Sequence, residues 1–333
     1  MPEPVLTAGS RPSRRHFLSW PLTLPLCLPL SLPALLPLSR PLVLGLSGAL
    51  LGGCALDTDH NHTGADAPSS AALPRRPRTA WVFSSGGPRG FVHVGVLKAL
   101  HELGHKPDLI VGASAGALLG VLRGSGLTGT ELERLALDLR PLALARLAGW
   151  GRESGERFSG SAIADLVREQ LRLRGQSGRL EDLPMMTVCV ARLASQNTTV
   201  AFSRGDAGLA VQASAAIPGQ FVPVRIRGQL HDDADSVMPL PVRLARQLGA
   251  TRVLAVDASA HEDRAPAGAQ RYRAGDQRKR ALTRPDAQAA DVLLHPDFGY
   301  WVNLSQEFRE RAILAGYRET MAAAPRILAL HAA

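Results

Sequence analysis

The chain of 333 residues is poor in cysteine, which occurs at Cys27, Cys54 and Cys189. It has no Cys-x-x-Cys pair and no Cys/His spacing typical of zinc proteins, so we expect neither a disulfide framework nor a metal site. Aromatic residues make up 5% of the chain. No recognition helix and no platform of aromatic and basic residues is visible, so nucleic acid is not an expected partner.

Acidic residues are outnumbered, because 29 Asp and Glu residues face 38 Lys and Arg residues and give a formal net charge of +9. A basic excess can favour anionic phosphate surfaces, either nucleic acid or lipid headgroups. Here nearly all basic residues are Arg and they are scattered, which is typical of a solvated surface. The 45% of hydrophobic residues suffice for a full core, and the length allows one large or two small domains.

The first 53 residues have the pattern of an export signal. Arg14 and Arg15 precede Phe17 and a long apolar stretch, as in a twin-arginine signal. The stretch is rich in Pro, which removes backbone donors and argues against a stable spanning helix. A transmembrane anchor or a misassigned start codon is the alternative. Small residues precede Cys54, and this resembles the lipobox of bacterial lipoproteins, in which the Cys sulfur carries diacylglycerol.

The sequence therefore predicts a lipoprotein of the cell envelope with an export signal over residues 1–53 and a lipidated tether over 54–78. Ala55, and not Asp, follows Cys54. We therefore expect the outer membrane and not the inner membrane, with the protein facing the periplasm. Residues 55–78 lack apolar periodicity, which indicates a flexible segment.

A glycine-rich turn follows the first predicted strand. Residues 80–83 form a short apolar run typical of a buried strand, and helical spacing resumes after a turn that contains Gly86, Gly87 and Arg89. Such an arrangement points backbone N–H groups from a helix N-terminus toward a phosphate or an oxyanion. Ser85 replaces the first Gly of a dinucleotide fingerprint and no Walker lysine follows, so neither nucleotide motif fits.

A second strand-to-helix junction carries a candidate nucleophile. The apolar run at 108–111 leads into residues 112–116, which match G-x-S-x-G with Ser114 at the centre. This setting is the one in which the motif forms a nucleophile elbow. Gly112 and Gly116 leave room for the sharp turn, and the following helix directs its positive end at the developing oxyanion.

The base for this serine has two possible sources. An α/β-hydrolase supplies an Asp and then a His later in the chain, and Asp257 and His295 occur in that order. The acidic run at 232–235 is the other source, because it precedes a Pro-Leu-Pro-Val segment at 239–242.

Taken together, these segments resemble the patatin-like phospholipases over roughly residues 79–325. The glycine-rich loop, the G-x-S-x-G motif about 25 residues later, the Ser-Ala-Ala-Ile-Pro segment at 214–218 and the acidic run before residues 239–242 occur in the family's order. The resemblance implies an α/β fold with a mainly parallel central sheet flanked by helices in a three-layer sandwich.

The resemblance also implies a Ser–Asp dyad, with Ser114 as nucleophile, Asp233 as base and no requirement for His. The backbone N–H groups of Gly86 and Gly87 would hold the oxyanion, and Arg89 would add positive charge. No cofactor is implied.

The acidic run departs from the family's pattern, since Ala234 replaces a Gly and Asp235 stands where a small residue is expected. A second carboxylate close to the dyad would disfavour ionisation of both groups. That could suit a general base, mark a weakened enzyme, or have no effect if Asp235 points to solvent. A shift of one residue in the alignment would make Asp232 the base.

Apolar runs that alternate with helical patterns indicate a mainly parallel sheet covered by helices. The runs lie at 80–83, 108–112, 187–191, 198–202 and 252–257. Residues 130–148 and 160–173 are predicted to be surface helices. Residues 261–289 are polar and basic, and we expect a mobile loop that either touches anionic lipid or is simply solvated.

The sequence thus predicts a serine acyl hydrolase of the phospholipase A or lysophospholipase type. Its expected partners are a phospholipid or another acyl ester as substrate, and a membrane surface reached through the lipid anchor. A general carboxylester or thioester hydrolase with the same dyad is the first alternative. A lipid-binding lipoprotein with weakened catalysis is the second.

Overall fold

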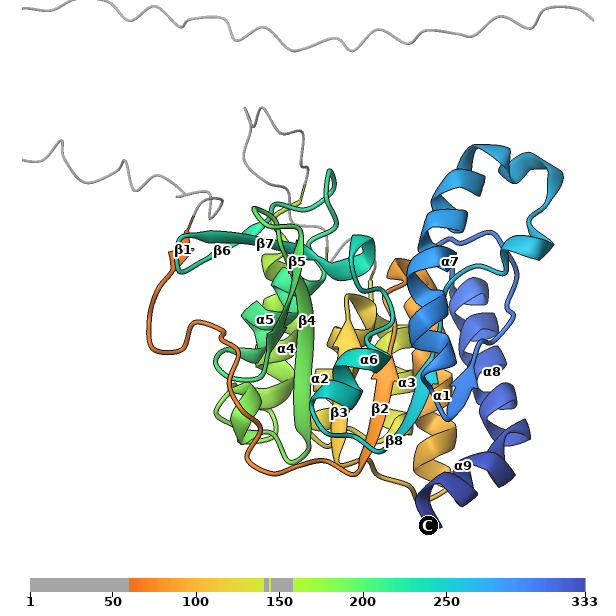
Figure 1. Cartoon of the computed structure of the whole chain (residues 1–333), viewed down its shortest axis with the longest axis horizontal. Coiled ribbons are helices and arrows are strands. Elements are labelled where there is room, and N and C mark those ends of the chain that lie inside the picture. Colours follow the sequence, from red (N-terminus) through yellow and green to blue (C-terminus); the bar gives the residue numbers. More distant parts are fainter. Residues whose placement is uncertain (1–59, 141–143, 145–157, 333) are drawn as a thin grey trace, which may run out of the picture. The chain divides into compact units, whose positions relative to one another are not determined.

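A mainly parallel β-sheet organises the chain, of which the computed structural model describes residues 60–140, 144 and 158–332 (Figure 1). Within these residues the sheet has nine strands, and β5 (Thr198–Phe202) pairs with β4 outside the main path. The order of that path is β1 (Asn61–His62), β6 (Val224–Ile226), β7 (Gln229–Asp233), β4 (Met186–Leu193), β3 (Leu109–Ala113), β2 (Thr79–Phe83), β8 (Arg252–Val256) and β9 (Val292–Leu294). The five strands from β4 to β9 along this path are parallel, whereas β5 and β7 run antiparallel to β4.

Helices cover both faces of this sheet, which makes three layers (Figure 1). They are α1 (Phe91–Glu102), α2 (Ala115–Gly124), α3 (Gly129–Asp138), α4 (Ser161–Arg172), α5 (Ala207–Ser214), α6 (Val242–Gln247), α7 (Arg273–Gln288), α8 (Gln306–Ala322) and α9 (Ala324–Ala332). Alternate side chains of β2 show why both faces need cover. Trp81 and Phe83 join a core with α1 and α8, whereas Ala80 and Val82 join a core with α6. The predicted fold class is confirmed.

The predicted strands and the second predicted helix have counterparts close to their expected bounds. The run at 187–191 lies in β4, and the second predicted helix is α4, whose buried face includes Ile163, Val167 and Leu171. The first, expected over 130–148, is α3 and ends at Asp138, whereas residues 141–143 and 145–148 of the prediction lie outside the described residues. Arg140 precedes a Pro, and residues before Pro are disfavoured in a helix, so the local sequence accounts for the early end.

The expectation of a flexible tether is wrong for residues 60–78, which lie along the domain. β1 pairs with β6, and the backbone of Ala71 exchanges hydrogen bonds with the Ser203 hydroxyl. Ala67 is buried. Backbone groups at a sheet edge need partners whatever the side chains are, so a segment without apolar periodicity can still be held.

The prediction of a mobile loop over 261–289 is also wrong, because most of these residues are helical. Two short 3₁₀ helices, Glu262–Arg264 and Ala267–Tyr272, lead into α7. Polar groups hold α7, since the buried Asp286 accepts from the backbone N–H of Arg243 at 2.7 Å and pairs with its guanidinium at 3.0 Å. This polar anchoring leaves no apolar stripe for a periodicity argument to detect.

The predicted export signal over residues 1–53 and the predicted lipidation of Cys54 lie outside the described residues. In the described part of the chain, no helix combines the length and the apolar character that crossing a membrane requires. By its internal contacts, Ala55–Ala333 is a compact unit of its own.

The close packing of α1 against α8 generates a stability prediction. A Cβ at Gly95 would lie 1.8 Å from the carbonyl oxygen of Ile313, whereas a Cβ at Gly275 in α7 would meet no atom within 4 Å. Gly95→Ala should therefore lower the free energy of unfolding by about 1–3 kcal/mol, as overpacking does. Gly275→Ala should leave it unchanged or raise it by up to ~1 kcal/mol, because Ala favours a helix. Urea denaturation measures both, and equal stabilities would show that α1 and α8 can separate freely.

Candidate active site

Ser114 occupies a strained turn between β3 and α2. Its backbone has φ 55° and ψ −121°, which is uncommon for a residue other than Gly and costs about 1–3 kcal/mol. The turn is tight, because a Cβ at Gly112 would lie 2.3 Å from the carbonyl oxygen of Gly116. A Cβ at Gly116 would lie equally close, 2.3 Å, to the carbonyl oxygen of Phe83. Both predicted elbow glycines thus stand where a side chain has no room.

A second serine, Ser214, stabilises this turn through hydrogen bonds. The N–H of Ser114 donates to Ser214 Oγ at 2.8 Å, and Ser214 Oγ donates to the carbonyl oxygen of Val190 at 2.5 Å. Ser214 ends α5 and is fully buried. It belongs to the Ser-Ala-Ala-Ile-Pro segment noted in the sequence, but nothing in the local pattern indicates this role.

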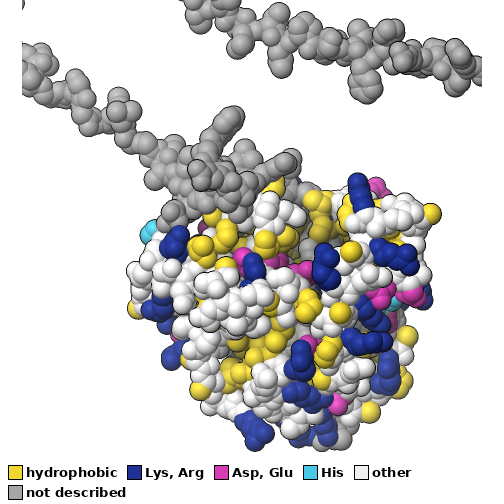
Figure 2. Space-filling view, turned by 45° about the horizontal axis from the view of Figure 1, so that its top comes forward, with side chains coloured by type: hydrophobic (Ala, Val, Ile, Leu, Met, Phe, Trp, Pro, Cys, Tyr) yellow, Lys and Arg dark blue, Asp and Glu magenta, His cyan; other side chains and the backbone are white. Residues whose placement is uncertain are grey.

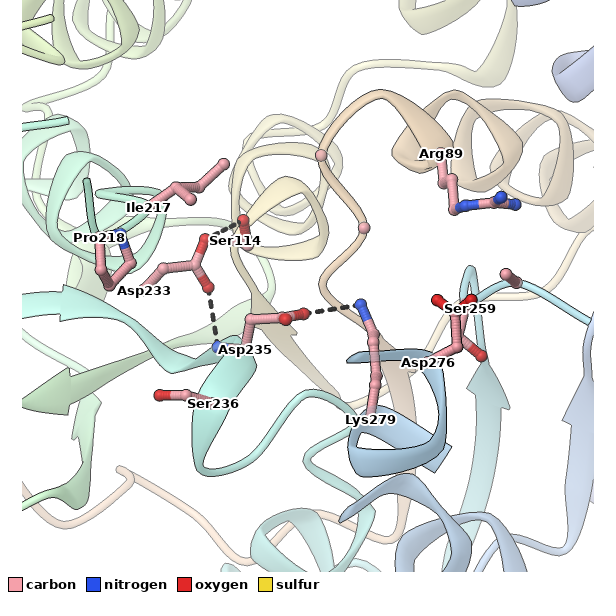
Figure 3. Close-up of a pocket in the computed structure, with 13 residues that line it drawn as sticks. Arg89, Ser114, Ile217, Pro218, Asp233, Asp235, Ser236, Ser259, Asp276 and Lys279 are labelled. Carbon is pink, nitrogen blue, oxygen red and sulfur yellow. Dashed lines mark hydrogen bonds and ion pairs between the residues drawn. The ribbon is translucent and has the colours of Figure 1, made fainter. Parts of the chain in front are cut away.

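Asp233 ends β7 and faces Ser114 (Figure 3). Its Oδ2 accepts a hydrogen bond from Ser114 Oγ at 2.6 Å, and its Oδ1 accepts one from the backbone N–H of Asp235 at 2.9 Å. The strand between them sets this distance, because Val190 of β4 pairs with Ala113 and the next residue, Ala191, pairs with Asp233. The structure thus brings the predicted nucleophile and base together.

Burial raises the pKa of the Asp233 carboxyl to about 7. The group is 2% exposed, and removal from water disfavours its charged form. The Ser114 hydrogen bond opposes this rise, whereas the nearby Asp235 carboxylate adds to it. A carboxylate that takes up a proton near neutral pH is matched to general-base work.

Asp235 turns away from the dyad toward Lys279 (Figure 3). Its Oδ1 accepts from Lys279 Nζ at 2.6 Å and from the hydroxyl of Ser85. Burial acts to raise the pKa of Asp235, but Lys279 and Ser85 outweigh it and the pKa lies below its usual range. Lys279 comes from α7, in the segment expected to be a mobile loop, and no local sequence pattern indicates that it reaches this site.

The other candidate bases contact groups other than Ser114. Asp232 forms a two-pronged ion pair with Arg192, and the alternation of β7 turns it to the opposite face of the sheet from Asp233. Asp257 is buried and accepts from the backbone N–H of Ser259 at 2.8 Å. His295 stacks on His261.

Histidine has no place beside Ser114 in the described part of the chain, since the residues lining the cavity around Ser114 and Asp233 include none. His93 is buried in α1 with Nε2 on the carbonyl oxygen of Ser84 at 2.9 Å, and burial lowers its pKa to about 4. His231 bonds to the carbonyl oxygen of Gln229.

The predicted oxyanion loop lies beside the serine. Gly86 and Gly87 line the same cavity, and Gly87 has a φ of +50° that favours Gly. Among the described residues no acceptor is recorded for the backbone N–H groups of these two glycines, which leaves both N–H groups available to a ligand.

Arg89 does not have the role expected from the sequence. Its guanidinium donates to the carbonyl oxygens of Tyr300 and Gly299 and packs against the rings of Phe298 and Tyr300. The side chain points away from Ser114 (Figure 3). Burial lowers its pKa from the usual value. Arg89 therefore links the predicted oxyanion loop to residues 298–300. Its positive charge does not face the predicted oxyanion site.

Two cavities of opposite character meet at Ser114. A polar one of about 340 Å³ is lined by charged and hydroxyl side chains that include Arg89, Asp235, Ser236, Ser259, Asp276 and Lys279. An apolar one of about 430 Å³ is lined mainly by Leu, Ile and Phe side chains. Gly87, Ser114 and Ile217 border both. In the described residues no group of three or more His, Cys, Asp and Glu side chains is placed to hold a metal ion.

Comparison with known proteins places this geometry in a family. Residues 81–246 match the family model described as patatin-like phospholipase. An uncharacterized NTE family protein of Mycobacterium tuberculosis (strain ATCC 25618 / H37Rv) is 32% identical over 199 residues, which cover 59% of this chain and 54% of the relative. A lysophospholipase of Coccidioides immitis (strain RS) is 30% identical over 201 residues, which cover 56% of this chain and 12% of the relative.

The chain thus spans about half the length of the mycobacterial relative. Among solved structures, full-length ExoU from Pseudomonas aeruginosa aligns with a TM-score of 0.43 at 13% identity over 85% of this chain and 62% of that one. The family match runs from the strand before the oxyanion loop to the helix after Asp233. This chain belongs to the patatin-like phospholipase family.

Proposed function

We propose that the chain is a serine acyl hydrolase that cleaves fatty-acyl esters of phospholipids or lysophospholipids. The observation that carries the proposal is the 2.6 Å hydrogen bond from Ser114 Oγ to a buried Asp233, placed where an apolar and a polar cavity meet. A relative that is named a lysophospholipase adds support.

The chemistry follows from the contacts. Asp233 takes the proton of Ser114 Oγ as this oxygen attacks the ester carbonyl, and the tetrahedral oxyanion receives the N–H groups of Gly86 and Gly87. Asp233 then returns the proton to the leaving alcohol. Water attacks the acyl-enzyme with Asp233 again as base, and the fatty acid is released.

The two cavities suit the two parts of such a substrate. The apolar cavity is lined by side chains such as Leu118, Leu122 and Phe221, which would surround an acyl chain. The polar cavity offers Ser236, Ser259 and charged groups to the headgroup side of the ester. A short soluble ester would use less of the apolar cavity and lose that part of its binding.

A fluorophosphonate probe tests the dyad on the chain from Ala55 onward. The unchanged protein should be labelled, and Ser114→Ala and Asp233→Asn should lose labelling, because one lacks the nucleophile and the other the base. Gel fluorescence measures the label, and Asp257→Asn is the matched control that should keep it. A folded protein that is not labelled would contradict the hydrolase proposal and favour a lipid-binding role.

The raised pKa of Asp233 generates a pH dependence. The base must be ionised to accept a proton, so kcat/KM should rise with pH through about 7 and fall tenfold for each unit below that value. A stopped assay with a lysophospholipid from pH 5 to 9 measures it. A rise of kcat/KM centred near pH 4 would show that Asp233 is not the titrating base, or that water reaches its carboxyl group in solution.

The Asp235–Lys279 pair should tune that profile. Lys279→Met leaves the Asp235 charge uncompensated and should move the rise to higher pH, whereas Asp235→Gly leaves Lys279 alone and should move it to lower pH. The double variant should return close to the unchanged protein. Arg284→Gln, an exposed cation on the same helix, is the control. Identical profiles for all variants would show that the pair does not act on Asp233.

We also propose that residues 1–53 direct export and that Cys54 carries the lipid that holds the domain at the periplasmic face of the outer membrane. The support is the twin-arginine-like and lipobox-like sequence. Intact mass of the protein from the cell envelope should equal that of residues 54–333 plus a diacylglycerol and an amide-linked acyl group. Cys54→Ser should abolish the added mass, and an unmodified Cys54 in the mature protein would overturn the proposal.

A further inference from the structure

Exposed apolar side chains occur at Tyr272 and in the segment 301–304, whose last residue lines the apolar cavity. Tyr272, Trp301, Val302 and Leu304 are 42–49% exposed, and we call them the aromatic patch. The ring centroids of Tyr272 and Trp301 lie 6.0 Å apart in an edge-to-face contact, although 28 residues separate the two in sequence. Large side chains this exposed and in mutual contact indicate an interaction surface.

The aromatic patch is continuous with the substrate cavities. Leu304 belongs to the patch and also lines the apolar cavity. Tyr272 immediately precedes α7, and α7 supplies Asp276 and Lys279 to the polar cavity. The aromatic patch therefore adjoins the apolar cavity through Leu304 and is joined by α7 to residues of the polar cavity.

Cationic residues are frequent in the segment that carries Tyr272. Residues 261–284 hold seven basic and three acidic residues. Arg271, Arg273 and Arg278 are exposed, and none of them pairs with a carboxylate in the part of the chain that the structure describes. The Arg271 guanidinium lies 4.6 Å from the centroid of the Tyr272 ring. Figure 2 shows Lys and Arg side chains beside apolar ones on the right of the view, the side on which Figure 1 labels α7.

We propose that the aromatic patch and Arg271, Arg273 and Arg278 form a docking surface for an anionic lipid bilayer. Trp and Tyr rings favour the layer between headgroups and acyl chains, because one end is apolar and the other polar. Each Arg near an anionic membrane adds attraction. Docking in this place passes an acyl chain from the bilayer to the apolar cavity without exposure to water, and this reasoning rests on the proposed hydrolase function.

The partner is a bilayer and not an acidic protein, because Leu304 of the patch also lines the cavity proposed for acyl chains. A protein partner would cover this part of the cavity. Arg271 and Arg273 also lie on either side of Tyr272 along the chain, as expected for a surface that meets a plane of anionic headgroups.

Vesicle sedimentation tests the docking surface in the Ser114→Ala protein from Ala55 onward, so that neither the anchor nor hydrolysis affects the result. Vesicles of phosphatidylcholine alone and mixed with phosphatidylglycerol are compared. We expect binding to the mixed vesicles that weakens with added salt. Arg271→Gln/Arg273→Gln should weaken it roughly 10–30-fold, since each Arg contributes about one kcal/mol. Trp301→Ser should weaken binding as well.

Matched controls remove equivalent groups elsewhere. Arg318→Gln/Arg326→Gln replaces two exposed arginines of α8 and α9, and Leu328→Ser replaces an exposed apolar side chain of α9. Both should bind vesicles like the unchanged protein. Equal binding by patch and control variants, or binding that does not depend on phosphatidylglycerol, would overturn the proposal.

An activity comparison separates this proposal from the hydrolase proposal. With Ser114 present, Trp301→Ser should hydrolyse a water-soluble short ester at the unchanged rate and vesicle phospholipid more slowly. Loss of vesicle binding by the inactive protein would overturn docking whatever the enzyme does. A protein that binds vesicles through the patch but cleaves no ester would overturn hydrolysis and leave docking intact.

Discussion

One strand, β4, sets the distance between Ser114 and Asp233, the proposed nucleophile and base. Its consecutive residues Val190 and Ala191 pair with Ala113 on one side and Asp233 on the other, so both site segments take their register from one backbone. Ser214 strengthens the arrangement, because its hydroxyl joins Val190 to the N–H of Ser114. A slip of one residue on either side would turn a functional side chain to the opposite face of the sheet.

The site combines two features that a fold would not adopt for stability alone. Ser114 holds a strained backbone, and Asp233 is a carboxyl group with its pKa raised by burial. Conflict between local preference and global fold is typical of functional sites. Lys279 limits the electrostatic cost at Asp233, because it pairs with the neighbouring Asp235 carboxylate, whose charge would otherwise raise the pKa of Asp233 further. Asp235, which stands where the family has a small residue, is thus compensated by Lys279 of α7.

Local sequence was enough to predict the elbow, the oxyanion loop and most strands, because each depends on neighbours within a few residues. Asp233 could be located because a distinctive segment at 239–242 fixes the alignment. Lys279 and the pairing of β1 with β6 could not, since both depend on contacts between segments far apart in sequence. α7 was missed for a related reason, because a buried Asp286 holds it and not an apolar stripe.

The meeting of two cavities at Ser114 gives the two halves of a cleaved ester different ways out. Under the proposed function, the alcohol leaves through the polar cavity, and the water that hydrolyses the acyl-enzyme enters from the same side. The fatty acid still occupies the apolar cavity when the serine is free again. Its departure is therefore the last step of the cycle, and free fatty acid competes with the next substrate for the same space.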